Sequence, residues 1–298
     1  MKKEARGERR SIEKKLLLIL GIAFVLLLFV AVKSGFYKQV IDFFGTVPEH
    51  GEVEEEIGSK KVAKVEGLPP VSLPGIRKAR VAIVIDDMGR DMDSLRLLLE
   101  INIPISVAVL PYLSYSEEVA EEAKAKGGEV LLHMPMEPQD MLTNNPGKGV
   151  LLARMTKEEV ITQVENNIDA VPYIDGVNNH MGSRFTEDER LLKVALEVIK
   201  KRGNLFYLDS RTTTNSRGYE LAKEMGIRTA VRKIFLDNEQ DMVYIKDKVD
   251  ELIRVAKRDG KAIAIGHPYD VTFKAIQEMI PRFKEEGIEV VKVSELID

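Results

Sequence analysis

The stretch from Val81 to Gly89 constrains the fold of this chain more than any other. It reads Val-Ala-Ile-Val-Ile-Asp-Asp-Met-Gly. Five consecutive apolar residues, most of them β-branched, are typical of a strand buried on both faces, as in a parallel sheet. The run ends in Asp86 and Asp87, and at the exit turn both side chains can reach one place. Because two buried carboxylates are costly unless they meet a cation, a proton or a substrate, this strand end predicts a functional site.

Strand-like and helix-like segments alternate from Ala79 to the end of the chain. Strands that alternate with helices imply parallel pairing and right-handed crossovers. Seven or eight such units predict a closed or nearly closed (β/α) barrel of about seven parallel strands, and an open, doubly wound sheet is the alternative. Capping boxes that begin at Thr156 and Thr186 are expected to start two of the helices. The expected strands are Val81–Ile85, Ile105–Leu110, Glu129–His133, Gly176–His180, Leu205–Leu208, Lys233–Leu236, Ala262–Gly266 and Glu289–Val293.

Residues 16–33 are predicted to form a transmembrane anchor. The run from Leu16 to Val32 is uncharged and almost wholly apolar, which is near the lower limit for a helix that spans a bilayer. Most of the neighbouring basic residues precede this run, so the positive-inside rule places residues 1–15 in the cytoplasm as a basic tail. A cleaved signal peptide is the competing interpretation, although no clear small-x-small site follows the run.

The rest of the chain is then expected outside the cytoplasm, in the periplasm or at the cell surface, as part of a single-pass membrane protein. Residues 34–78 become acidic and contain Pro and Gly, which is typical of a flexible linker without a packed core. Residues 79–298 are expected to form the barrel domain.

Charge and composition exclude several classes of partner. The net charge is −4, with about +5 in the first 33 residues and about −1 in residues 34–79, so the main domain carries about −8. Nucleic acid is therefore not an expected partner, because binding a phosphate backbone needs a basic face. No phosphate loop and no Gly-x-Gly-x-x-Gly follows the first strand, so no nucleotide is expected. The chain lacks Cys, so a metal ion must be bound by His, Asp or Glu.

Several expected strands end in a His or an Asp. In a (β/α) barrel, catalytic groups gather at the C-terminal ends of the strands. A single His there is more often structural, but the whole set favours a functional site. A carboxylate with two neutral imidazoles suits Zn²⁺ or a similar divalent ion and leaves one position for water. A second carboxylate can act as general base and a further His can return a proton, so the set suits metal-assisted hydrolysis of an amide or ester. The residues are Asp86, Asp87, His133, His180, Asp209, Asp237 and His267.

These motifs together resemble the polysaccharide deacetylases of the NodB-homology type, specifically their divergent branch. The resemblance covers most of residues 80–298. It implies a distorted (β/α) barrel, a divalent metal ion and deacetylation of glycans that carry N-acetyl sugars. It also implies that Asp86 is the general base, Asp87 a metal ligand and His267 the general acid. The motifs are Ile85-Asp-Asp-Met-Gly89, His133-Met-Pro-Met-Glu-Pro138, Asn179-His-Met-Gly-Ser-Arg-Phe-Thr186, Asp209-Ser-Arg-Thr-Thr213 and Gly266-His-Pro268.

The chain departs from the main branch of that family in its metal ligands. The main branch places two metal-binding histidines as His-x-x-x-His, whereas the fourth residue after His133 here is Glu137. The Arg-x-Pro-Tyr motif is also absent, and His180-Met-Gly-Ser-Arg184 stands at about that place. We therefore assign His133 and His180 as ligands beside Asp87, with Glu137 as the substitute ligand.

Three further residues have open roles. Arg184 is a candidate for binding a carboxylate product or an oxyanion, and a salt bridge to a helix start such as Glu187 is the alternative. Asp209 is expected either to orient His267 or the general base, or to cap the loop that follows it. Asp237 is interpreted as a turn residue.

The sequence thus favours a membrane-anchored, zinc-dependent hydrolase that removes N-acetyl or O-acetyl groups from a cell-envelope or peptidoglycan-type polysaccharide. The departures keep a second hypothesis open, in which the domain is a non-catalytic glycan-binding or regulatory envelope protein. A metal-dependent phosphoesterase would use similar ligands, but the acidic domain lacks a phosphate-binding loop.

Overall fold

The computed structural model describes residues 78–298. The predicted basic tail (1–15), the predicted anchor (16–33) and nearly all of the predicted linker lie outside this range. Within residues 78–298, no helix is both long enough and apolar enough to cross a bilayer.

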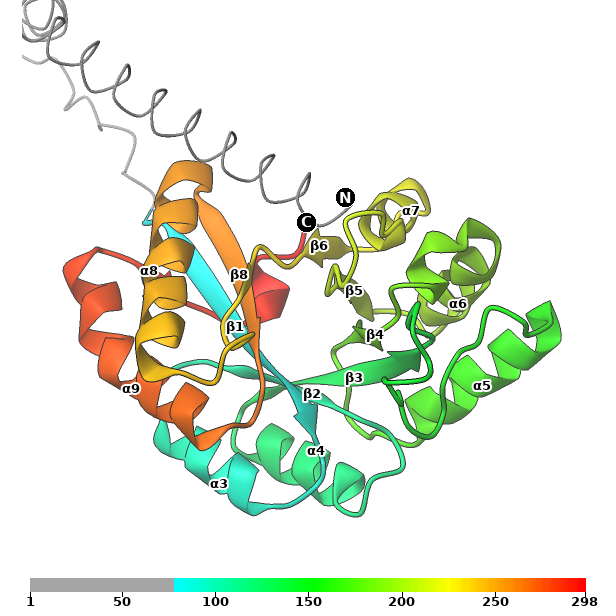
Figure 1. Ribbon diagram of the computed structural model, residues 1–298, viewed down its shortest axis with the longest axis horizontal. Helices are drawn as coiled ribbons and strands as arrows, with labels where there is room; N and C mark the ends of the chain where they lie inside the picture. Colours follow the sequence, from blue (N-terminus) through cyan, green and yellow to red (C-terminus); the bar gives the residue numbers. More distant parts are fainter. Residues whose placement is uncertain (1–77) are drawn as a thin grey trace, which may run out of the picture. The chain divides into compact units, whose positions relative to one another are not determined.

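The described chain forms one curled, wholly parallel sheet (Figure 1). The strand order is β6-β5-β4-β3-β2-β1-β8-β7, and β9 pairs with the beginning of β1 beside this path. A parallel sheet with helices between its strands confirms the predicted barrel-like α/β class. The strands are β1 (Arg80–Met88), β2 (Ser106–Val109), β3 (Glu129–Met136), β4 (Gly176–Met181), β5 (Phe206–Asp209), β6 (Thr229–Val231), β7 (Ile234–Phe235), β8 (Lys261–Gly266) and β9 (Glu289–Val290).

Helices surround the outside of the curled sheet (Figure 1). The capping box at Thr156 is confirmed: its hydroxyl accepts from Glu159 N, and the Glu159 carboxylate accepts from Thr156 N. The box at Thr186 is wrong, because Asp188 caps that helix and the Thr186 hydroxyl donates to the Gly182 carbonyl. The helices are α3 (Asp93–Glu100), α4 (Ser116–Ala125), α5 (Lys157–Asp169), α6 (Glu189–Lys201), α7 (Gly218–Glu224), α8 (Met242–Asp259) and α9 (Asp270–Glu285), with short 3-10 turns at Phe185–Glu187 and Val293–Glu295.

The path contains eight strands, whereas about seven were expected. The additional strand is β6, which lies between α7 and β7. The strands at the two ends of the path, β6 and β7, are separated by Arg232 and Lys233 alone. Arg232 N donates to the Asp209 carbonyl, whereas Lys233 N donates to the Ile263 carbonyl. The backbone therefore passes from pairing with β5 to pairing with β8 within two residues, which joins the two edges of the sheet. The flanking charges and the length of three residues explain why β6 was not predicted.

The inside of the curled sheet is filled by alternate strand residues. A cluster distinct from the layer under the helices contains Ala82 and Val84 of β1, Phe206 and Leu208 of β5, and their neighbours. The C-terminal residues Val293 and Leu296 belong to the same cluster, so they close the N-terminal end of the barrel. Side chains alternate along a strand, so every second residue of a strand points into the barrel. The inward residues that follow this cluster along each strand therefore lie at the C-terminal end of the barrel.

Candidate metal centre

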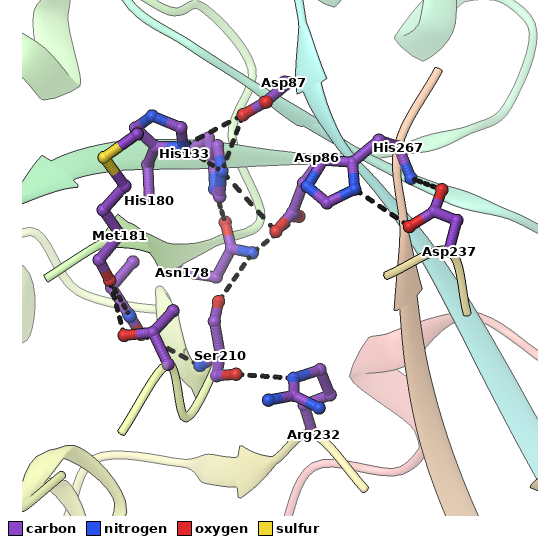
Figure 2. A network of polar contacts seen from close by, with 12 residues as sticks. Asp86, Asp87, His133, Asn178, His180, Met181, Ser210, Arg232, Asp237 and His267 are labelled. Carbon is purple, nitrogen blue, oxygen red and sulfur yellow. Dashed lines mark hydrogen bonds and ion pairs between the residues drawn. The ribbon is translucent and has the colours of Figure 1, made fainter. Parts of the chain in front are cut away.

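The C-terminal layer of the barrel interior is polar. Three of its residues follow strand residues that point into the barrel. Ala82 and Val84 of β1 are followed two positions on by Asp86, Leu131 of β3 by His133, and Ile263 and Ile265 of β8 by His267. Asn178 lies beside His133 in register and continues β4, while Ser210 and Arg232 continue β5 and β6. The remaining cluster residues come from the exits of β1 and β4, and Figure 2 shows how these side chains converge. The buried members are Asp86, His133, Asn178 and Ser210.

Three predicted ligands meet at one point. Asp87 Oδ1 lies 2.9 Å from His180 Nδ1 and 3.2 Å from His133 Nε2, and the two ring nitrogens are 3.1 Å apart (Figure 2). Ligand atoms around a tetrahedral zinc ion, with bonds of about 2.0–2.1 Å, lie about 3.3 Å from one another. This triangle therefore has nearly the size that a small divalent ion requires.

One oxygen of the triangle lacks a hydrogen-bond partner within residues 78–298. Asp87 Oδ1 is buried and receives no well-directed hydrogen bond, although two imidazole nitrogens lie beside it. Burial alone would raise the pKa of Asp87, but the two imidazoles hold it well below its usual range. Burial likewise opposes protonation of His133, yet Asp86 and Asp87 raise its pKa. The cluster therefore attracts positive charge, and the donor set of two imidazoles and one carboxylate fits Zn²⁺ or a similar metal ion.

Asn178 fixes which nitrogen of His133 faces the triangle. Asn178 Nδ2 donates to Asp86 Oδ1 at 2.8 Å and to the Ser210 hydroxyl at 3.2 Å. The carbonyl oxygen of Asn178 must then be the atom that faces His133 Nδ1, at 2.9 Å. Since this oxygen accepts, Nδ1 carries the hydrogen and Nε2 keeps a lone pair for a metal ion.

Asp86 and His267 flank the triangle. Asp86 is buried with Oδ2 3.5 Å from His133 Nε2, and Figure 2 shows it between His133 and His267. Burial raises the pKa of Asp86, against the opposing effects of the two histidines and the Asn178 amide. Its carboxylate thus has a higher proton affinity than that of Asp87.

His267 is oriented by Asp237. Its Nδ1 lies 2.9 Å from Asp237 Oδ1, and its backbone N–H donates to Asp237 Oδ2 at 2.6 Å. Burial would lower the pKa of His267, but the hydrogen bond and charge of Asp237 raise it. The prediction that Asp237 is a turn residue is therefore wrong: it is a buried partner of His267, because it shares the inward orientation of Phe235.

The structure places the other predicted site residues away from the triangle. Glu137 pairs with Arg184, whose Nε lies 3.1 Å from its carboxylate, and also accepts from Ala153 N at 2.5 Å. Asp209 accepts from Arg211 N and the Ser216 hydroxyl, so it caps the loop after β5. Asp209 has the outward orientation of Tyr207 and does not contact His267 or Asp86.

Left-handed backbone marks the loops around the site. Asp87, Met181 and Arg211 have φ angles of 59°, 52° and 48°, and all three lie at strand ends on this face. Such conformations are unfavourable for residues other than glycine and collect at functional sites. At Asp87 this conformation turns the carboxylate back toward His133 and His180.

Comparisons with known proteins agree with this architecture. A family described as divergent polysaccharide deacetylase matches residues 83–297. Uncharacterized protein YibQ of Escherichia coli strain K12 is 36% identical over 220 residues, which cover 74% of this chain and 67% of that protein. An uncharacterized protein of Haemophilus influenzae is 34% identical over 209 residues, which cover 70% and 74%. The crystal structure of uncharacterized protein ATU2773 from Agrobacterium tumefaciens C58 is similar with a TM-score of 0.70 and 28% identity, covering 75% of this chain and 91% of that one.

Proposed function

Because the chain belongs to the divergent polysaccharide deacetylase family, we propose that it hydrolyses acetyl groups from a polysaccharide with the help of a divalent metal ion. The observation that carries this proposal is the triangle of Asp87, His133 and His180, flanked by Asp86 on one side and by His267 with Asp237 on the other. This set supplies metal ligands, a base and an acid within one polar layer.

The metal ion proposed for the triangle is Zn²⁺, since two imidazoles and one carboxylate leave one tetrahedral position open. When bound, such an ion polarises the acetyl carbonyl and lowers the pKa of a water molecule. Asp87, His133 and His180 would hold it, and the Asn178 carbonyl would keep His133 in the tautomer that ligation needs.

The two flanking groups perform the proton transfers. Asp86 accepts a proton from the attacking water, since its buried carboxylate has a raised pKa and lies beside the triangle. His267 keeps its Nδ1 hydrogen on Asp237, so Nε2 is the nitrogen that gives a proton to the departing sugar nitrogen or oxygen. The acetyl group then leaves as acetate and the sugar retains a free amine or hydroxyl.

The proposed substrate is an N-acetylated or O-acetylated glycan of the cell envelope, such as a peptidoglycan-type polymer. The location of the enzyme outside the cytoplasmic membrane, held by residues 16–33, is a proposal that rests on the sequence. A reporter that is active only outside the cytoplasm, fused after Asp298, tests this location. A reporter that is active only in the cytoplasm would contradict it.

The decisive experiment compares the full-length protein with its Asp86→Asn variant. We expect wild type to release acetate from an N-acetylated glycan and the variant to lose at least about 100-fold in rate, because a general base contributes about 10²–10⁴. Elemental analysis should find the same metal content in both proteins. Asp247→Asn, on the exposed side of α8, is the matched control and should leave both quantities unchanged.

Two other results would contradict this proposal, and each would support a different function. Glycan binding that persists in Asp86→Asn, without acetate release by metal-loaded wild type, would show a non-catalytic glycan-binding protein. Turnover of an aryl phosphate in place of an acetylated glycan would show a phosphoesterase.

A further inference from the structure

Two guanidinium groups lie near the metal centre without a carboxylate partner. Arg211 follows Ser210 at the end of β5, and Arg232 lies in the connection between β6 and β7. Neither of them forms an ion pair within residues 78–298, whereas Arg184 and Arg217 on the same face are paired with glutamates. On this side of the site two guanidinium groups therefore lack an ion-pair partner, although the charges of Asp86 and Asp209 act on Arg232 from a greater distance.

The guanidinium of Arg232 is held rigidly by two backbone carbonyls. Its Nε donates to the Ser210 carbonyl at 2.6 Å and its Nη2 donates to the Arg211 carbonyl at 2.8 Å. The cation also lies 4.9 Å from the centre of the Phe235 ring. Burial lowers the pKa of Arg232, the negative charges of Asp86 and Asp209 raise it, and the positive charge of Arg211 lowers it again. These two bonds orient the guanidinium and leave the hydrogens of Nη1 available, with no direct bond to a carboxylate.

Arg211 is an arginine at a position where the backbone conformation would favour glycine or asparagine. Its φ angle is 48°, in the left-handed region where glycine or asparagine would be less strained. The backbone is fixed from both sides, because its N–H donates to Asp209 Oδ1 at 2.8 Å and its carbonyl accepts from Arg232. Its side chain is exposed. A long charged side chain at a strained, fixed position points to a function for the charge.

Both residues are connected to the catalytic layer through Ser210, the carbonyl of which accepts from Arg232 and which precedes Arg211 in the chain. The Ser210 hydroxyl accepts from Asn178, which also donates to Asp86. On the other side of Arg211, the Thr212 hydroxyl donates at 2.8 Å to the carbonyl of Met181, the residue after His180. Figure 2 shows Arg232 next to Ser210, on the side of Asn178 away from Asp87. A glycan bound at the triangle would therefore reach this positive edge.

We propose that Arg211 and Arg232 bind a carboxylate carried by the glycan, so that the enzyme selects acidic over neutral polysaccharides. Guanidinium groups bind carboxylates with paired, charge-assisted hydrogen bonds, and two adjacent cations without carboxylate partners favour an anionic ligand. The inference rests on the proposed deacetylase function and defines the class of its substrate as an acetylated glycan with carboxylate-bearing sugars.

A matched pair of substrates tests the inference. The first is an acetylated oligosaccharide that contains carboxylate-bearing sugars, and the second is the same compound with its carboxyl groups reduced to alcohols. We expect the full-length enzyme to prefer the first by about tenfold in kcat/KM, through KM. Arg211→Gln should bring the ratio close to one, and Arg211→Lys should keep part of it. Arg217→Gln removes a charge from the same loop and should leave the ratio unchanged.

A second set of measurements separates charge recognition from a structural role. Arg211→Gly relieves the left-handed strain, so it should keep or raise the melting temperature while it abolishes the preference. A lower melting temperature with an unchanged preference would overturn the inference. The inference would also be overturned if Arg211→Gln changed inhibition by free acetate but left the preference for the carboxylate substrate unchanged. The cations would then bind the product and not the glycan.

Failure of the deacetylase proposal has a different signature. If neither oligosaccharide releases acetate, calorimetric binding of the two compounds to wild type and Arg211→Gln still decides the inference. Tighter binding of the carboxylate form, lost in the variant, supports it, and equal binding of both forms overturns it.

Discussion

Asn178 connects the two halves of the site with one amide group. Its nitrogen donates to the Asp86 carboxylate and its oxygen accepts from His133 Nδ1, while the side chain is wholly buried. A carboxylate at this position would repel Asp86, and an apolar group would leave both partners unsatisfied. The amide therefore allows a proposed base and a proposed ligand to lie side by side.

We predict that Asn178→Ala weakens metal binding by about 10- to 100-fold, the usual effect of removing the partner that orients a ligating histidine. Competition with a chromogenic chelator measures the affinity directly. Asn238→Ala, at an exposed position after β7, is the control and should bind as wild type does. Equal affinities for all three proteins would show that Asn178 does not orient His133 for ligation.

A second residue-scale prediction concerns Asp237 and the pH profile. The folded-state pKa of His267 is raised, so a general acid here is protonated below that pKa and loses activity as pH rises through it. Asp237→Asn removes the charge that raises this pKa, so its activity relative to wild type should fall progressively as pH increases.

The control for this prediction is Thr272→Val. It removes the hydroxyl that donates to Asp237 Oδ2 at 2.7 Å but leaves the carboxylate charged. In a plot of kcat/KM against pH, the alkaline limb of this variant should coincide with that of wild type. A limb that moves equally in both variants would indicate a packing effect instead of an electrostatic one.

At the scale of single strands, the site was predictable only in part. The apolar runs of β1, β3 and β8 lead straight to Asp86, His133 and His267, and the sequence located these strand ends. The inward alternation would also have identified Asn178 and Ser210, since they continue inward series in β4 and β5. Residue type alone, an Asp or a His at a strand end, does not say on which face of the sheet the side chain lies.

Asp209 and Asp237 show the consequence. Asp209 follows Leu208, which points inward, so its own side chain faces the helices. The same alternation does not place Asp237. The even-numbered residue Ala230 of β6 points inward, whereas in β7 it is the odd-numbered residue Phe235 that does so. This change occurs at the two residues where pairing passes from β5 to β8, and no local signal in the sequence announces it.

The outward position of Asp209 gives a prediction about stability. Its carboxylate accepts from Arg211 N at 2.8 Å, the Ser216 hydroxyl at 2.7 Å and Tyr219 N at 3.1 Å, which together hold the loop before α7. Asp209→Ala should lower the free energy of unfolding by about 2–4 kcal/mol, because one buried donor and two partly buried donors lose their acceptor. Metal content should remain that of wild type.

Ser216→Ala provides the comparison, because it removes one of these hydrogen bonds and should cost about 1 kcal/mol. Chemical denaturation measures both values. Loss of bound metal in folded Asp209→Ala would instead assign Asp209 to the metal centre.

At the scale of the whole molecule, the barrel interior has two different ends. At the N-terminal end, the Ser106 hydroxyl donates to Glu129 at 2.6 Å, and the backbone N–H groups of Val293 and Ser294 donate to these two side chains. That end is thereby closed by the C-terminal segment with its hydrogen bonds satisfied. The C-terminal end instead gathers a buried carboxylate and imidazoles whose best partner is a cation. Stability is therefore expected to depend on what binds at this end.

This dependence gives the final prediction. A ligand that binds the folded state alone stabilises it by about 2.7 kcal/mol at 100 times its dissociation constant. For a domain of about 200 residues this corresponds to a rise in melting temperature of roughly 5–10 °C. Calorimetry of the metal-stripped protein, with and without Zn²⁺, should show this rise in wild type and in Asp86→Asn. The double variant His133→Ala, His180→Ala should show none, because two of the three ligands are gone. A rise of equal size in the double variant would place the metal elsewhere, and no rise in wild type would remove the basis for metal-dependent hydrolysis.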